Sequence, residues 1–113
     1  MKIQKLGDVV VVSPKGWLVG GVETDELEDV IRTQMAEGNR RLVLDLGEVV
    51  MLNSLAVGAL MGCRQSYKSR EGHMVLCGLN QRILRIFLLT QLTLVFELHP
   101  TREAALAAIQ QVA

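Results

Sequence analysis

The sequence has no excess of charge of either sign, and this absence argues against a protein that binds nucleic acid. Twelve lysines and arginines stand against twelve aspartates and glutamates among the 113 residues, so the formal net charge is zero. Proteins that bind DNA or RNA usually carry a positive excess, because they neutralise phosphates. No run of like charge marks a membrane-surface patch either.

The sequence also lacks a long apolar run. The longest stretch without a charged residue extends from Val49 to Cys63, which is too short to span a bilayer. The first residues, MKIQKLGDVVVV, contain neither the apolar segment nor the small-residue cleavage site of a secretory signal peptide. We therefore expect a cytoplasmic protein with no direct membrane insertion.

Cysteine and histidine are both scarce, with two residues of each. Cys63 and Cys77 fall in different expected elements and form no CxxC pair, so we expect buried, reduced thiols. His73 adjoins an expected strand and His99 precedes a proline, and neither has a ligand partner at the spacing of a metal site. The sequence therefore predicts no metal centre.

The common catalytic motifs are absent as well. There is no GxxxxGK[ST] phosphate-binding loop, no GxGxxG that opens a helix after a strand, and no GxSxG around any serine. Asp45 and Glu48 flank the end of an expected strand, where α/β proteins often place functional groups. A single Asp is also a common strand terminator, and we favour that interpretation. We expect neither an enzyme nor a cofactor.

The length and the hydrophobic pattern predict one domain over residues 1–113. Strands are expected at residues 9–12, 17–19, 42–46, 74–77 and 93–98. Helices are expected from Thr24 to a stop at Gly38–Asn39, at 54–70, at 81–89, and after Pro100. Residues 47–52 are expected to form a loop. Strands that alternate with helices predict an α/β fold with a mostly parallel sheet, to which the first strands add an antiparallel edge.

Two small polar residues, Asn53 and Ser54, interrupt the apolar stretch VVMLNSLAVGAL. Both residue types are favoured helix N-caps, so capping alone would account for them. The alternative is that Ser54 presents its hydroxyl at the first turn of the helix, where the helix dipole favours a phosphate. A phosphate adds up to about two negative charges, which suits the control of a protein–protein interface.

Over nearly its whole length the sequence resembles the STAS domain family, and within it the bacterial anti-sigma factor antagonists. The stretch RLVLDLGEVVMLNSLAVGALMGC is similar to the family's apolar strand ending in Asp-Leu, its loop, and the Asp-Ser-Ser-Gly motif that opens a helix. The stretch REGHMVLCGLNQRILRIFLLTQLTLVFELHPTREAAL is similar to the next strand, helix, loop, short strand and closing helix. The resemblance implies a STAS-type mixed, mostly parallel sheet of about four to six strands with four α-helices.

The resemblance also implies a mechanism of regulation without catalysis. In regulatory members, an anti-sigma factor that is also a serine kinase phosphorylates the first serine of the motif. The unphosphorylated form binds the anti-sigma factor and frees the sigma factor, and a phosphatase resets the switch. By position, Ser54 matches the phosphoacceptor and Asn53 matches the Asp before it. Leu55 stands where the second Ser is usual, and Ala56 where Gly is usual.

We therefore expect an anti-sigma factor antagonist whose partners are an anti-sigma factor with serine kinase activity and a phosphatase. The expected partner-binding residues are Met51, Leu52, Asn53, Ser54, Leu55, Val57 and Arg64. The alternative is a STAS scaffold without phosphorylation, either in a stressosome-like complex or in a lipid-transport ABC system. Formation of a homodimer is left open.

Overall fold

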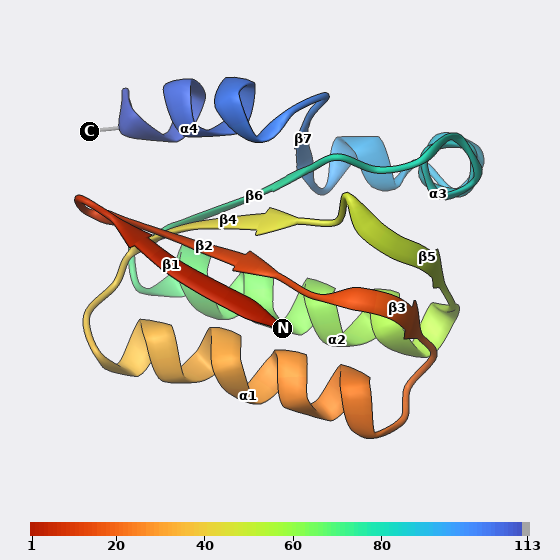
Figure 1. Cartoon of the computed structure of the whole chain (residues 1–113), viewed down its shortest axis with the longest axis horizontal. Helices are drawn as coiled ribbons and strands as arrows, with labels where there is room; N and C mark the ends of the chain where they lie inside the picture. The colour runs from red at the N-terminus through yellow and green to blue at the C-terminus, as the bar shows by residue number, and fades with distance from the viewer. Residues whose placement is uncertain (112–113) are drawn as a thin grey trace.

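A five-stranded sheet forms the centre of the computed structural model, which describes residues 1–111 (Figure 1). Its strand order is β1-β2-β4-β6-β7. The strands are β1 (Lys2–Leu6), β2 (Val9–Ser13), β4 (Arg41–Asp45), β6 (His73–Cys77) and β7 (Glu97–His99). The expected domain also includes residues 112–113, which lie outside the described part of the chain.

The central strands are parallel, and the first strand adds the antiparallel edge. β1 and β2 form an antiparallel pair, whereas β2, β4, β6 and β7 pair in parallel. The run Val9–Val12 is fully buried, and so are Leu42–Leu44. Strands that are covered on both faces need such continuous apolar runs. The expected α/β fold with a mixed, mostly parallel sheet is confirmed.

Helices cover both faces of this sheet (Figure 1). The helices α1 (Val22–Ala36) and α2 (Ser54–Ser69) lie on one face, and α4 (Arg102–Gln110) lies on the other. The helix α3 (Gln81–Leu89) adds its buried Ile83 and Phe87 to the same core as α1 and α2. Because side chains alternate along a strand, Val10 and Val12 pack toward α1 and α2. Val9 and Val11 pack toward α4.

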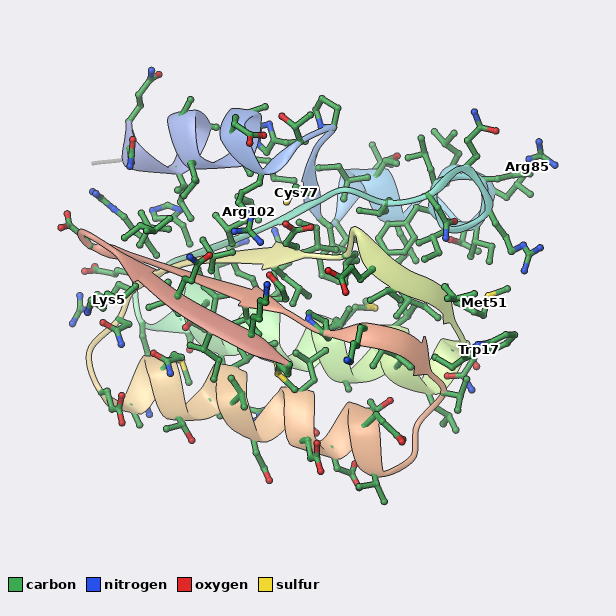
Figure 2. The ribbon with its side chains drawn as sticks, in the orientation of Figure 1. Lys5, Trp17, Met51, Cys77, Arg85 and Arg102 are labelled. Carbon is green, nitrogen blue, oxygen red and sulfur yellow. The ribbon has the colours of Figure 1, made fainter. Side chains whose placement is uncertain are left out.

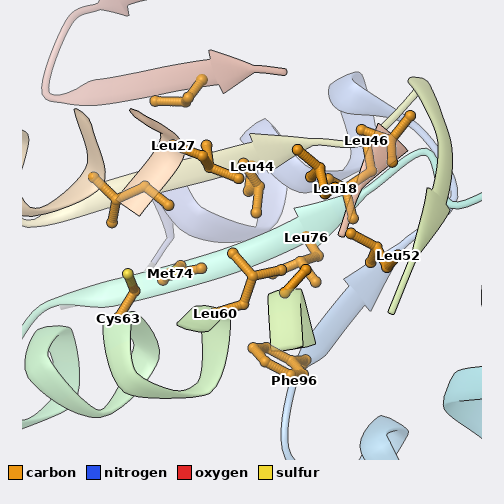
Figure 3. Packing of buried hydrophobic residues seen from close by; sticks show 14 of the residues in the cluster. Leu18, Leu27, Leu44, Leu46, Leu52, Leu60, Cys63, Met74, Leu76 and Phe96 are labelled. Atoms are coloured by element: carbon orange, nitrogen blue, oxygen red, sulfur yellow. The ribbon is translucent and has the colours of Figure 1, made fainter. Parts of the chain in front are cut away.

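The larger core lies under α1 and α2 (Figure 3). Leu27 of α1, Leu44 of β4 and Leu60 of α2 are all buried in it, and none is more than 2% exposed. Burying side chains of this size stabilises a fold by roughly 1.5–3 kcal/mol each relative to leaving them exposed. The core therefore holds α2 firmly and sets where its first turn lies.

A second, two-stranded sheet corrects the expectation of a loop at residues 47–52. β5 (Glu48–Leu52) pairs in parallel with β3 (Lys15–Leu18). Val49 and Leu52 are buried while Val50 is exposed, so the segment presents one face to the core. This small sheet extends beyond the ends of the central strands and lies beside the start of α2 (Figure 1).

The expected strand at residues 93–98 is also wrong in its extent. Leu92–Leu94 form a 3-10 turn and only Glu97–His99 form the strand β7, which pairs with Val75–Cys77 of β6. Gln91 adopts a left-handed backbone (φ 61°), which ends the extended path before the turn. The run of Leu, Thr and Val has the local pattern of a strand. In the fold, however, Leu94 is exposed and Phe96 is the residue that is buried in the core.

None of the helices formed by residues 1–111 is long and apolar enough to cross a membrane. Both cysteines are buried and free, as expected from their spacing. Burial raises the pKa of the Cys63 thiol to about 11, and the nearby Arg32 offsets part of this effect. Burial also raises the pKa of Cys77 to about 12, with a smaller contribution from Asp45.

Candidate partner-binding site

Asn53 fixes the start of α2 through both ends of its side-chain amide. Its Oδ1 accepts a hydrogen bond from the backbone N–H of Ala56 at 3.1 Å, which is the geometry of a helix N-cap. Its Nδ2 donates to the backbone carbonyl of Val19 at 2.8 Å. The backbone N–H of Asn53 also donates to the carbonyl of Leu18 at 3.2 Å. These bonds join the first turn of α2 to the segment that follows β3.

Ser54 is the first residue of α2, and it is exposed. Within the described part of the chain, its hydroxyl has no hydrogen-bond partner. The first N–H groups of a helix have no intrahelical acceptor. A phosphate on this hydroxyl would therefore lie next to unpaired donors and the positive end of the helix dipole. The site is accessible and favours a negative group.

Leu55 projects from the same turn and is 66% exposed. It packs over Gly20, which has a left-handed backbone (φ +88°). A Cβ built on Gly20 would lie 2.7 Å from the Cβ of Leu55, closer than carbon atoms approach in real structures. Gly20 therefore provides both the conformation and the space that this turn requires.

The remaining predicted residues separate into buried and accessible ones. Leu52 is 4% exposed, so its side chain belongs to the core, and so does that of the motif residue Ala56, which is 1% exposed. Val57 is half-buried against the same core. Met51 is half-exposed and is the pairing partner of Trp17 across the small sheet (Figure 2).

Arg64 lies apart from the other predicted residues. It is ten residues beyond Ser54 in α2, which corresponds to about 15 Å along the helix axis. There it lines a hollow together with Lys68, Arg40 and His73. The fold therefore brings Met51, Asn53, Ser54 and Leu55 together but leaves Arg64 at the other end of the helix.

Trp17 and Val19 belong to the segment that is hydrogen-bonded to Asn53 at the start of α2, and the sequence alone did not assign them to a site. Trp17 is 57% exposed on β3, and Val19 is also exposed. Both line a shallow groove of about 660 Å³. A solvent-exposed tryptophan indicates a binding surface, because Trp is enriched among the residues that contribute most to interface energies. We call the group Trp17, Val19, Val50, Ser54 and Leu55 the Ser54 surface.

Asn80 shapes the edge of this surface, and sequence reasoning missed it as well. The register between β3 and β5 skips Val50, which makes a β-bulge. The side chain of Asn80 donates to the carbonyls of Val49 and Val50 at 3.2 and 3.1 Å, and its Oδ1 caps α3 through Ile83. The bulge exposes Val50 while its backbone remains hydrogen-bonded.

Asp45, one of the two carboxylates considered for catalysis, has structural partners. Asp45 accepts hydrogen bonds from the backbone N–H of Gly47 and from Nε of Arg102, both at 2.9 Å. Arg102 also bonds Gln4 and Ser13, so it joins α4 to β1 and β2. His99 lies 2.7 Å from a carboxylate oxygen of Glu97. Residues 1–111 contain no group of three His, Cys, Asp or Glu side chains that could hold a metal ion.

Comparison with known families agrees with this fold. The family model of the STAS domain matches residues 1–105, which is nearly the whole chain. The chain belongs to the STAS domain family. The family resemblance and the STAS-type fold expected from the sequence are therefore confirmed.

Several relatives of this STAS domain carry names of regulators. The sequence is 26% identical over 110 residues to BtrV of Bordetella bronchiseptica, which is named as an anti-sigma factor antagonist. The aligned region covers 97% of this chain and 94% of BtrV. An anti-sigma factor antagonist from Mycobacterium paratuberculosis has a crystal structure that is similar with a TM-score of 0.82. The two are 27% identical, over 97% of this chain and 92% of that one.

The fold also matches SpoIIAA, an anti-sigma factor antagonist solved in its unphosphorylated form. The TM-score is 0.77 and the identity 15%, over 98% of each chain. SpoIIAA from Bacillus has also been solved in a phosphorylated form, with a TM-score of 0.73 and 16% identity over 96% of this chain and 97% of SpoIIAA. A sulfate transporter family protein and the STAS domain of a SulP transporter share the fold too, so the fold by itself does not decide the function.

Proposed function

We propose that this STAS domain is an anti-sigma factor antagonist, which binds an anti-sigma factor through the Ser54 surface and is switched off by phosphorylation of Ser54. The observation that carries the proposal is the position of Ser54. Its exposed hydroxyl lies at the first turn of α2, next to the exposed side chain of Leu55. The names of BtrV and of the Mycobacterium protein support the same role.

The character of the surface supports a mechanism of competitive binding rather than catalysis. The Ser54 surface has four exposed apolar side chains: Trp17, Val19, Val50 and Leu55. A complementary apolar surface of the anti-sigma factor would cover them and leave the small hydroxyl at the contact. The anti-sigma factor so bound can no longer hold its sigma factor. This role is expected in the cytoplasm, where the buried thiols of Cys63 and Cys77 remain reduced.

Phosphorylation would switch the surface off through desolvation and charge. A phosphate brings up to about two negative charges and three strong acceptor oxygens into an apolar contact. Covering such a group without a cationic partner is costly. The helix start tolerates the phosphate in the free protein, because the unpaired N–H groups and the dipole favour it. The modification therefore penalises the complex more than the fold.

The test combines phosphorylation with complex formation. The protein is incubated with the kinase-type anti-sigma factor from the same organism and ATP, and the phosphate is located by mass spectrometry. We expect it on Ser54, and we expect Ser54→Ala to bind the anti-sigma factor without being modified. Ser54→Asp should weaken binding at least about tenfold, because it places a charge in the contact.

A matched control is available on the same helix. Ser69 is exposed near the end of α2, and its hydroxyl donates to the carbonyl of Ser66. Ser69→Ala should leave both the phosphorylation and the complex unchanged. The absence of both a complex and a phosphate on Ser54 would contradict the proposal. A complex that forms without phosphorylation would favour a constitutive STAS scaffold instead.

A further inference from the structure

A second hollow lies at the other end of α2 from Ser54. Its volume is about 670 Å³, and it forms where α2 ends and where β4 and β6 begin. β7 pairs only with Val75–Cys77, so the first residues of β6 have no neighbouring strand on this side. Among the residues that line the hollow are Arg40, Arg41, Arg64 and Lys68.

The hollow concentrates positive charge in a chain whose net charge is zero. Four permanent cations and His73 line it, against the two carboxylates of Glu71 and Glu97. The carboxylate of Glu97 is bonded to His99 at 2.7 Å. Five of the twelve acidic residues instead lie among the first eight residues of α1: Glu23, Asp25, Glu26, Glu28 and Asp29.

Three of these cations form no ion pair with any of the described residues. Arg41 forms an ion pair with Asp8 at 3.3 Å. By contrast, no ion pair or side-chain hydrogen bond is formed by Arg40, Arg64 or Lys68 within residues 1–111. The hollow therefore presents donors that remain available to a ligand.

Arg64 and Lys68 repel each other on α2, and no ion pair within the described residues offsets this repulsion. Arg64 and Lys68 are four residues apart on α2, and like charges at this spacing destabilise a helix. Lys68 in the last turn gains from the helix dipole, but this effect falls off within one turn and does not extend to Arg64. Arg64 is also only half-exposed. An anion held between the two side chains would turn this repulsion into attraction.

We propose that this basic hollow binds a small anion that carries two or more phosphate groups. Guanidinium groups match phosphate oxygens with paired hydrogen bonds, and Arg40 and Arg64 supply two of them from different elements. The volume falls in the range of roughly 300–1,000 Å³ that is typical of small-molecule sites. A long nucleic acid does not fit this charge distribution, because the adjacent strand end carries Glu97 and α1 is strongly acidic.

The test is a calorimetric titration at low salt with inorganic tripolyphosphate, with ATP as a second arm. We expect one molecule bound per chain. The double variant Arg64→Gln/Lys68→Gln should weaken binding at least about tenfold, because two charge-assisted contacts are lost. The matched control is Arg82→Gln/Arg85→Gln, which removes the same charge from exposed positions on α3. It should change the affinity less than about twofold, because these charges are remote and screened.

Several outcomes would overturn the assignment. These are an absence of binding at millimolar tripolyphosphate, an equal loss in both double variants, citrate binding as tight as tripolyphosphate, or tighter binding of a single-stranded RNA oligomer. Chemical-shift changes at the amides of Gly72 and His73 in the unmutated protein provide a test that does not depend on the variants folding. Stronger binding of ATP would identify a nucleotide, and equal binding a free phosphate chain. Ser54→Ala should leave this binding unchanged, which separates the result from the proposed function.

Discussion

The side-chain amide of Asn53 donates a hydrogen bond to the backbone carbonyl of Val19 at 2.8 Å while its oxygen caps α2. An aspartate at this position, which is usual in the family motif, can accept the capping bond but cannot donate the second one. The altered motif therefore has a structural use in this chain: it joins the start of α2 to the segment that follows β3. The loss of a carboxylate beside Ser54 is accompanied by a more firmly held helix start.

Replacement of Asn53 should separate these two bonds. Asn53→Asp retains the cap but loses the donor to Val19, and we expect a loss of about 1 kcal/mol in the free energy of unfolding. Asn53→Ala loses both bonds and should cost about 2 kcal/mol. Urea unfolding of the three proteins measures the difference. If both variants lose the same free energy of unfolding, the cap contributes nothing to stability. If Asn53→Asp is as stable as the unmutated protein, the bond to Val19 contributes nothing.

Substitution of Gly20 should be costly because of its backbone and its contact with Leu55. A Cβ there meets Leu55 at 2.7 Å, and φ is +88°. We expect Gly20→Ala to lower the free energy of unfolding by roughly 1–3 kcal/mol. Gly58 in α2 is the control, because a Cβ there has nothing within 4 Å. Gly58→Ala should stabilise the protein by about 0.5–1 kcal/mol, and a similar effect at both positions would contradict the predicted contact.

Trp17 should contribute to binding far more than to stability. It is 57% exposed and lines the groove beside Val19. We expect Trp17→Ala to weaken the complex with the anti-sigma factor at least about tenfold, since large aromatic side chains dominate interface energies. Ile3 on β1 is 49% exposed and serves as a control for a general loss of apolar surface. Surface plasmon resonance measures both affinities. Equal weakening by Ile3→Ala and Trp17→Ala would argue against the Ser54 surface as the contact.

The stability of the protein should fall at alkaline pH because of its buried thiols. Burial raises the pKa of Cys63 from 9.0 to about 11. Above pH 9 the unfolded chain loses this proton while the folded chain keeps it, so the unfolded state gains stability as the pH rises. The contribution is complete below pH 9 and is lost by about pH 11. Between pH 8 and pH 10 the loss should be about 1 kcal/mol for this thiol.

The comparison with Cys63→Ala isolates this contribution from that of the other alkaline groups. Unfolding in urea is measured at both pH values for the two proteins. The decrease should be smaller in the variant by about 1 kcal/mol. If the two decreases agree, the Cys63 thiol does not retain its proton in the folded protein.

The central strands were predictable from the sequence because buried strands consist of continuous apolar residues. Val9–Val12 and Leu42–Leu44 are continuous apolar runs, and such runs suit only strands that are covered on both faces. The start of α2 was also predictable, because Asn53 and Ser54 are capping residues and the motif resembles that of a known family. β5 was not predictable in this way, because its parallel pairing with β3 joins residues about thirty positions apart and depends on contacts that no local pattern records.

The sequence by itself determined the family and the α/β architecture, since both depend on patterns within short segments, and it predicts Ser54 as the phosphoacceptor. Only the tertiary structure decided which residues share a surface with Ser54. It joined the segment of Trp17 and Val19 to the start of α2, buried Leu52 and Ala56 in the core, and carried Arg64 to the basic hollow at the far end of α2. The physical reason is that burial depends on which segments pack together, whereas a motif records only their order along the chain.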